Sequence, residues 1–219
     1  MSQQKVKYVV GIGGKNGTGK GSLLGASPAA ANYTVVSPGN LLREARKNGT
    51  DLGKKAQSYM DAGELVPDSL IISLVLEAIA STDKDVILDG FPRTVPQAHA
   101  MLAAGIKPLK FIILEVSDDE LLQRAKDRIV CPSCGQPYTL NDYQPPKVSG
   151  ICDLCGTALI RRKDDDESVV KNRLAVYAEQ TAPAFPVLAG AGIPIHYIQN
   201  GNARPKGEAL SEFNALLTI

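Results

Sequence analysis

Short runs of apolar, β-branched residues alternate along the chain with segments whose apolar residues recur at helical spacing. The runs typical of buried strands are 8–12, 33–36, 85–89, 110–116 and 193–198. Helical spacing marks residues 40–49, 67–81, 94–105 and 118–128. This alternation predicts an α/β fold, with a mostly parallel sheet covered by helices on both faces. Ligands of such sheets bind beyond the carboxyl ends of the strands.

Polar and glycine residues mark where the helices begin and end. Ser117 followed by Glu120 predicts a capping box at the start of the helix over 118–128. The glycines that fit helix ends are Gly49, Gly63 and Gly105. A further helix that opens near residue 20 contains Gly25 and meets Pro28, so we expect it to be short or kinked.

Two stretches interrupt the strand–helix alternation. Residues 37–66, the helical insert, show helical spacing without a strand, and residues 127–165, the cysteine insert, are rich in turn residues, prolines and cysteines. Neither resembles a separate domain. We therefore predict one discontinuous core, made of 1–36, 67–126 and 166–219, that carries two small inserts.

Charge and hydropathy exclude some classes of protein. The chain is 44% hydrophobic and its formal net charge is +1, so no overall field favours nucleic acid or a membrane surface. The longest apolar run, residues 70–80, is too short to span a bilayer and contains Glu77. No apolar leader is visible at the N-terminus. We expect a cytoplasmic protein, most simply a monomer, that holds any anionic ligand by local positive charge.

A glycine-rich loop, "GIGGKNGTGKGSLL", follows the first strand. Gly14, Gly19 and Lys20 form the pattern G-x-x-x-x-G-K, with Ser22 one place later than the usual hydroxyl. Glycines let backbone N–H groups surround phosphate oxygens, the lysine neutralises charge, and the Ser22 hydroxyl is a candidate to reach Mg²⁺. An ordinary strand–helix turn is the plain alternative. A dinucleotide fingerprint fits worse, because Asn16 stands where its third glycine belongs.

All four cysteines lie in the cysteine insert as two Cys-x-x-Cys pairs: Cys131, Cys134, Cys152 and Cys155. This spacing is typical of a four-thiolate zinc ribbon, and four protein ligands leave no open position, which indicates a structural metal. An insert of this size buries little apolar surface, so a metal would hold it as one rigid piece. Reduced thiols or a disulfide are the alternatives, and a disulfide is uncommon in the cytoplasm.

Several motifs together resemble the adenylate kinases and related nucleoside monophosphate kinases. The loop ends in G-K-G-S rather than G-K-S, and the other matching segments are "SPGNLLREA" (37–45), "LDGFPRTVPQA" (88–98) and "RRKDDDESVVKNRL" (161–174). The resemblance runs in order from residue 8 to about 203, and the cysteine insert is similar to the zinc-containing lid of the long form. It implies a P-loop nucleotide kinase fold with a central five-stranded parallel sheet.

The resemblance also implies an activity and a set of site residues. The activity is reversible phosphoryl transfer from MgATP to AMP, giving two ADP. The implied ATP-binding residues are Gly17, Thr18, Gly19, Lys20, Gly21, Ser22, Arg124, Arg128, Pro137, Tyr138 and Ala203. The implied AMP-binding residues are Pro38, Arg43, Glu64, Leu65, Val66, Gly90, Phe91, Pro92, Arg93, Gln97, Arg162 and Arg173, with Gln97 reading the adenine edge. Tyr138 stands where the lid covers the donor base. Ser22 and Asp89 map to Mg²⁺, through the nucleotide or water.

The residue types suit this chemistry. Phosphoryl transfer needs alignment and positive charge on the phosphoryl oxygens rather than an acid–base pair. Arginine binds phosphate with two parallel hydrogen bonds and stays charged. The residues predicted to act in catalysis are Lys20, Arg93, Arg128, Arg162 and Arg173. His99 and His196 are isolated in apolar surroundings and are not assigned a role.

Some positions depart from the family pattern, and two other functions stay open. The departures are Lys15, Asn16, Pro38, Asn40, Asp127 and Ile129. They are expected to slow the enzyme or loosen its choice of base without loss of function, because Lys20, Arg93, Arg128, Arg162 and Arg173 all remain. A kinase for UMP, CMP or GMP is the nearer alternative, and Gln97 with the long insert favours AMP. A zinc-ribbon protein that binds nucleic acid is disfavoured by the near-neutral charge and by the lack of aromatic clusters beside the thiols.

Overall fold

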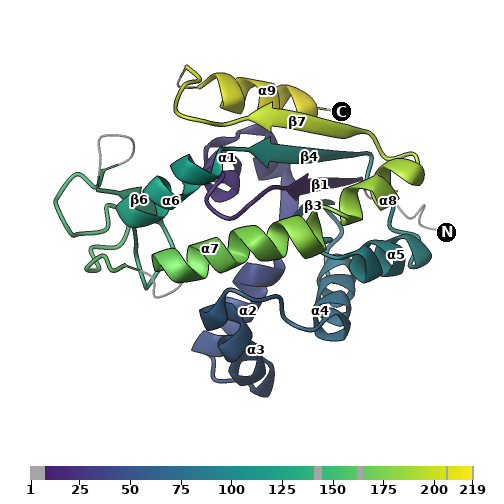
Figure 1. Ribbon diagram of the computed structural model, residues 1–219, viewed down its shortest axis with the longest axis horizontal. Coiled ribbons are helices and arrows are strands. Elements are labelled where there is room, and N and C mark those ends of the chain that lie inside the picture. The colour runs from purple at the N-terminus through teal and green to yellow at the C-terminus, as the bar shows by residue number, and fades with distance from the viewer. Residues whose placement is uncertain (1–7, 141–144, 162–164, 206, 219) are drawn as a thin grey trace.

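The computed structural model describes residues 8–140, 145–161, 165–205 and 207–218. A five-stranded sheet of order β2-β3-β1-β4-β7 forms its centre. Figure 1 shows β1, β4 and β7 of this sheet with helices around them. Its strands are β1 (Val9–Gly13), β2 (Tyr33–Val36), β3 (Asp85–Asp89), β4 (Lys110–Glu115) and β7 (Ile195–Gln199). Every neighbouring pair is parallel. The α/β fold with a five-stranded parallel sheet is confirmed.

Helices cover both faces of the sheet. They are α1 (Lys20–Ala26), α2 (Pro38–Lys47), α3 (Asp51–Ala62), α4 (Asp68–Ala80), α5 (Val95–Ala103), α6 (Asp118–Asp127), α7 (Glu167–Val176), α8 (Ala184–Gly190) and α9 (Glu208–Leu217). A 3-10 turn (Ala29–Asn32) follows α1, and a π turn (Tyr177–Thr181) continues α7. Helix α1 is seven residues long, as its glycine and the following proline predicted.

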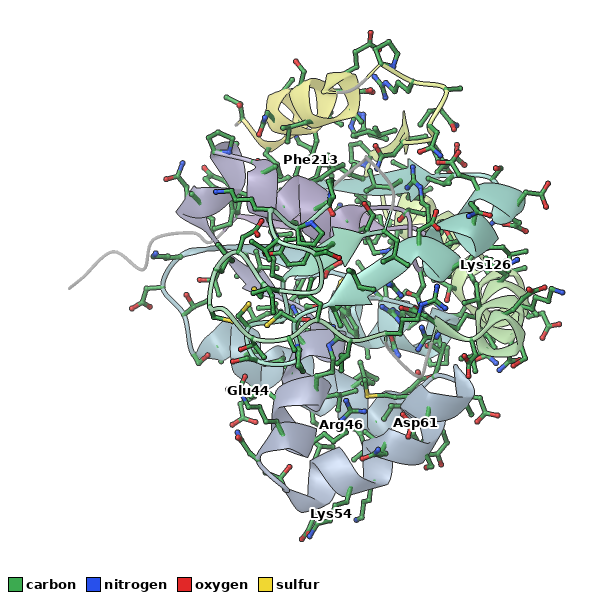
Figure 2. The ribbon with its side chains drawn as sticks, turned by 90° about the vertical axis from the view of Figure 1, so that its left-hand side faces the viewer. Glu44, Arg46, Lys54, Asp61, Lys126 and Phe213 are labelled. Carbon is green, nitrogen blue, oxygen red and sulfur yellow. The ribbon has the colours of Figure 1, made fainter. Side chains whose placement is uncertain are left out.

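Alternate residues of the central strands enter two separate cores. On one face Leu88 and Phe111 pack with residues of α4, α5 and α8. On the other face Ile87 and Ile112 pack with residues of α1 and α9, including Phe213, which Figure 2 shows beneath α9. Because successive strand residues point to opposite faces, one apolar run builds both cores.

The predicted boundaries lie within about two residues of the observed ones, and the start of the last strand and the capping box differ from the prediction for physical reasons. The last strand begins at Ile195 rather than at residue 193, because the Ile193 N–H closes the end of α8 by bonding the Leu188 carbonyl. Ser117 accepts a hydrogen bond from the Glu120 N–H at 3.4 Å, which is half of the predicted capping box. The Glu120 carboxylate, however, accepts from the Asn202 N–H instead of closing the box.

The helical insert contains α2 and α3, which lie together below the sheet in Figure 1. Gly53 lets the two helices approach closely, since a Cβ there would lie 2.3 Å from the Arg46 nitrogen. Arg46 also faces Asp61 at 3.7 Å, and Figure 2 labels both residues on this insert.

The cysteine insert contains the antiparallel strands β5 (Arg128–Val130) and β6 (Pro137–Thr139). Isolated bridges join Val130 to Ile160 and Ile151 to Ala158, which fold the insert back on itself. Among the described residues of the whole chain, no helix is long and apolar enough to cross a membrane.

Candidate active site

A cleft of about 570 Å³ lies beyond the carboxyl ends of β1 and β3. Its walls come from the glycine-rich loop, the helical insert, the turn before α5, the cysteine insert, α7 and residues 200–202. This is the edge at which parallel sheets bind ligands, as the alternation of strands and helices predicted.

The glycine-rich loop adopts a backbone that only glycine accommodates well. Gly14, Gly17 and Gly19 have φ of 124°, 89° and 91°. A Cβ at Gly14 would lie 2.4 Å from the Leu114 carbonyl oxygen, and a Cβ at Gly19 would lie 2.6 Å from the Asn200 amide nitrogen. The loop is therefore a tight turn enclosed by its neighbours, and α1 begins directly after it at Lys20.

Lys20 is held by the loop that precedes it. Its Nζ donates to the carbonyls of Gly14 at 2.7 Å and Lys15 at 2.9 Å. Burial lowers the pKa of Lys20 to about 8, and the nearby Asp89 carboxylate opposes this shift while Arg93 and Arg128 add to it. A positive group is thus kept in the cleft at a site where an incoming anion would stabilise its charge.

Asp89 ends β3 beside Ile12 of β1. Its Oδ1 atom is buried and has no hydrogen-bond partner among the described residues. A buried polar atom without a partner is costly, so this oxygen indicates a position at which a ligand binds. Ser22 is exposed and lines the same cleft. A carboxylate and a hydroxyl are oxygen donors of the kind that Mg²⁺ takes, directly or through water, so these residues fit that ion.

The turn after β3 delivers Arg93 into the cleft, as predicted. Gly90 has a φ of 71°, and the Phe91–Pro92 peptide bond is cis. The Arg93 Nε then donates to the Gly90 carbonyl at 2.8 Å. Burial lowers the pKa of Arg93, with the Asp89 carboxylate acting in the opposite direction.

Four further predicted arginines line the same cleft, namely Arg43, Arg124, Arg128 and Arg173. Arg128 donates to both carboxylate oxygens of Asp165, and Arg173 donates to the Met60 carbonyl at 3.2 Å. Arg124 instead donates to the carbonyls of Gly17 and Asn200, tying the glycine-rich loop to the loop after β7. Lys20, Arg93, Arg128 and Arg173 are therefore brought together from four segments. Arg162 lies outside the described residues.

The other predicted nucleotide residues divide into two groups. Those that line the cleft are Gly17, Gly19, Gly21, Ser22, Pro38, Arg43, Glu64, Leu65, Val66, Gly90, Pro92, Gln97, Pro137 and Tyr138. Those that do not line it are Thr18, Phe91 and Ala203. Thr18 and Phe91 are fully buried, whereas Ala203 is exposed beside the lining residue Asn202.

Tyr138 belongs chiefly to the interior of the cysteine insert. Its side chain packs with Ile129, Cys131 and Cys152, and only 3% of the residue is exposed. Its hydroxyl accepts from the Asp153 N–H at 2.7 Å. The ring therefore stabilises the insert, which the prediction of a base-covering role did not foresee.

Sequence reasoning missed several residues that shape the cleft. Asp68 bonds Gln97, Asp165 bonds Arg128, and Asn200 donates to the Thr18 carbonyl at 2.7 Å. Asn200 follows the end of β7, so its position after a parallel strand was an available signal. Asp68 and Asp165 are far in sequence from Gln97 and Arg128, so no local signal pointed to these two contacts.

The four cysteine sulfurs lie within 4.8 Å of one another, and no disulfide joins them. The Cys131–Cys155 and Cys134–Cys152 sulfurs are 3.4 and 3.6 Å apart. Zinc–sulfur bonds of about 2.3 Å in a tetrahedron place sulfurs about 3.8 Å apart, so the four thiols fit zinc.

Two similar turns position these thiols. The carbonyls of Cys131 and Cys152 accept from the N–H groups of Gly135 and Gly156 at 3.0 and 2.9 Å. Both glycines have positive φ, at 79° and 70°. The repeated C-x-x-C-G sequence thus builds two matching halves of one site.

Comparisons with known proteins agree with this arrangement. The family profile described as "Adenylate kinase" matches residues 12–189. The adenylate kinase of Lachnospira eligens is 43% identical over 188 residues, covering 82% of this chain and 87% of that protein. The adenylate kinase of Methanocella arvoryzae is 46% identical over 178 residues, covering 78% and 82%. The adenylate kinase of Exiguobacterium sibiricum is 40% identical over 213 residues, covering 93% and 96%.

Proposed function

Because the chain belongs to the adenylate kinase family and transfers a phosphoryl group reversibly from ATP to AMP, we propose that the cationic groups of this cleft perform that transfer. The observation that carries the proposal is the meeting of Lys20, Arg93, Arg128 and Arg173 in one cleft. Since the transferred group carries negative charge on its equatorial oxygens, converging cations stabilise it without any nucleophilic side chain.

The donor nucleotide lies on the glycine-rich loop in this proposal. Lys20 exchanges its carbonyl partners for phosphate oxygens, and the loop's backbone follows the phosphate chain. Arg124 fastens the loop to residues near Asn200 and Ala203, where the donor base would lie.

The acceptor lies between the helical insert and the turn before α5. Arg43, Arg93 and Arg173 surround its phosphate, and Arg162 is proposed to join them. Gln97 faces its base beside the apolar wall that contains Val66 and Ile71. The phosphates of both nucleotides then meet between Lys20 and Arg128, where the terminal phosphoryl group passes from ATP to AMP.

Mg²⁺ belongs to the ATP-bound form of the site. When bound, it neutralises charge on the donor phosphates and orients them for in-line transfer. The residues that would hold it, directly or through water, are Asp89 and Ser22. The partnerless oxygen of Asp89 supports this assignment.

The cysteine insert is proposed to act as a lid braced by zinc. Four thiolates leave the metal no open position, so its role is structural. Arg128 stands at the start of this insert and Asp165 at its end, so a rigid insert carries cleft residues with it as it moves. Closure excludes water, which otherwise competes with AMP as acceptor.

We propose that the core is discontinuous and consists of 1–36, 67–126 and 166–219, and that 37–66 and 127–165 are inserts in it. The view of the cysteine insert as one rigid, separate piece supports this division. We propose that the protein acts as a monomer in the cytoplasm, without nucleic acid or membrane partners. The near-neutral net charge supports the last point.

The direct test is an ADP-formation assay with MgATP and a panel of AMP, UMP, CMP and GMP. We expect AMP to be the preferred acceptor. Preference for a pyrimidine or guanine nucleotide would contradict the assignment of the acceptor site.

A further inference from the structure

Gln97 is fixed in the cleft by hydrogen bonds at both ends of its side-chain amide. Its Oε1 accepts from the Arg93 N–H at 2.8 Å, and its Nε2 donates to Asp68 Oδ1 at 2.7 Å. Only 2% of Gln97 is exposed. A backbone N–H can only donate and an ionised carboxylate can only accept, so these two partners decide which end of the amide is oxygen.

Asp68 is itself held in place. It is the first residue of α4, and its Oδ1 also accepts from the Thr94 hydroxyl at 3.0 Å. Thr94 caps α5, because its Oγ1 accepts from the Gln97 N–H at 3.2 Å. The hydroxyl's single hydrogen therefore goes to Asp68 and its lone pair to α5, which leaves no freedom to reverse the network.

A fixed amide has a fixed order of donor and acceptor toward the cleft. After its two internal bonds, Gln97 keeps one N–H and one oxygen lone pair for a ligand. Adenine offers the acceptor N1 beside the amino donor at position 6, whereas hypoxanthine offers the donor N1–H beside the acceptor O6. An amide free to rotate by half a turn would satisfy either base, but an amide held in one orientation satisfies only one.

We propose that Asp68, together with the backbone N–H of Arg93, determines base selectivity by holding the Gln97 amide in the orientation that accepts adenine and rejects hypoxanthine. Asp68 acts through Gln97 and is thus a positioning residue, not a catalytic one. This inference rests on the proposed AMP site. It assigns to Asp68 a role in discriminating purines that differ at positions 1 and 6.

The test compares kcat/KM for AMP and for IMP, the ribonucleotide of hypoxanthine, in the wild type and in Asp68→Asn and Asp68→Ala. The asparagine variant keeps the shape of the side chain and adds an amide donor. If the Gln97 amide turns by half a turn, its oxygen can then accept a hydrogen bond from residue 68. The alanine variant removes the partner. We expect the AMP-over-IMP ratio to fall about tenfold, with kcat/KM for IMP rising in absolute terms.

Two further variants distinguish a positioning role of Asp68 from a general loss of structure. Asp51→Ala removes the acidic first residue of α3, the position that Asp68 occupies in α4, and should leave the ratio within about threefold of wild type. Gln97→Met removes the amide, and Asp68→Ala added to it should change the ratio no further, because the pathway through Gln97 is already absent.

Equal losses for AMP and IMP in both Asp68 variants would overturn the proposal, since a merely structural role lowers both alike. A further fall of the ratio in the Gln97→Met background would also overturn it. If the alanine variant fails to fold, Asp68→Asn alone decides the matter. Failure of the proposed function is distinct, because the wild-type protein would then not convert AMP at all.

Discussion

The carboxylate of Asp165 holds the guanidinium of Arg128 from 37 residues away in the sequence, with the Arg128 Nε 2.9 Å from Oδ2. Both oxygens of Asp165 accept hydrogen bonds, and its side chain is 4% exposed, against 24% for Arg128. This pair joins the two ends of the cysteine insert and holds an arginine in the lining of the cleft.

Asp165→Ala should destabilise the protein and slow turnover. Removing the carboxylate takes two hydrogen bonds and the ion pair with Asp165 away from a partly buried cation, which we expect to lower the free energy of unfolding by about 1–3 kcal/mol. Urea denaturation measures this loss. Glu167→Ala breaks the exposed Lys126–Glu167 and Lys171–Glu167 pairs and should cost less than about 1 kcal/mol. Equal losses in the two variants would contradict the account of Asp165.

Lys20→Met should abolish phosphoryl transfer and leave the fold intact. The lysine contacts carbonyls of its own loop, so we expect Tm to change little while kcat falls about 10³-fold or more. Lys54→Ala is the charge-matched control, because Lys54 lies at the exposed tip of α3 (Figure 2). Turnover of the Lys20 variant within about tenfold of wild type would contradict a catalytic role for Lys20.

Binding of ATP near pH 8 should take up a proton at Lys20. Burial lowers the pKa of Lys20 to about 8 from 10.5, so the free protein loses this proton as the pH rises past 8. Phosphate stabilises the charged amine and raises its pKa, so affinity should fall about tenfold per pH unit above 8.

Calorimetry at pH 8 in two buffers with different ionisation enthalpies measures this proton uptake. The ATP phosphates are already ionised at that pH, because their last pKa lies near 6. Lys20→Met should show no uptake. Wild-type binding without proton uptake would show that Lys20 does not meet the phosphates.

Cys152→Ser should remove most of the bound zinc and leave the core folded. Cys152 is 2% exposed and its sulfur lies 3.6 Å from Cys134, so it is an internal member of the thiolate cluster. We expect zinc content, measured by atomic absorption, to fall from about one ion per chain toward zero, with far-UV circular dichroism of the core retained. Unchanged zinc stoichiometry would contradict the assigned ligand set.

The core was predictable from sequence because its signals are local. Residues 33–36 and 85–89 form strands with the predicted limits. The predicted burial holds for 85–89 and is wrong for 33–36, where only Val36 is buried, because β2 lies at the edge of the sheet. The G-x-x-x-x-G-K spacing is also a local signal, and Lys20 does line the cleft as it predicted. The strand order β2-β3-β1-β4-β7 has no such local signal.

Residues whose roles depend on distant partners were not predictable. Glu120 has the spacing of a capping box, yet its carboxylate accepts from the N–H of Asn202, 82 residues away, and also pairs with Arg124 one turn later in α6. Tyr138 lies on a three-residue strand, too short for a pattern to decide which side chains face inward. Asp68 is the first residue of α4, and its bond to Gln97, 29 residues away, has no local signal in the sequence.

The central claim is that cations from separate segments converge on the transferred phosphoryl group. The most direct test is a crystal structure with two adenosines joined through five phosphates, a mimic of both substrates together. We predict that Lys20, Arg93, Arg128, Arg162 and Arg173 place nitrogens about 3 Å from its phosphate oxygens. Arg128 and Arg173 directed into bulk solvent in that complex would contradict the claim.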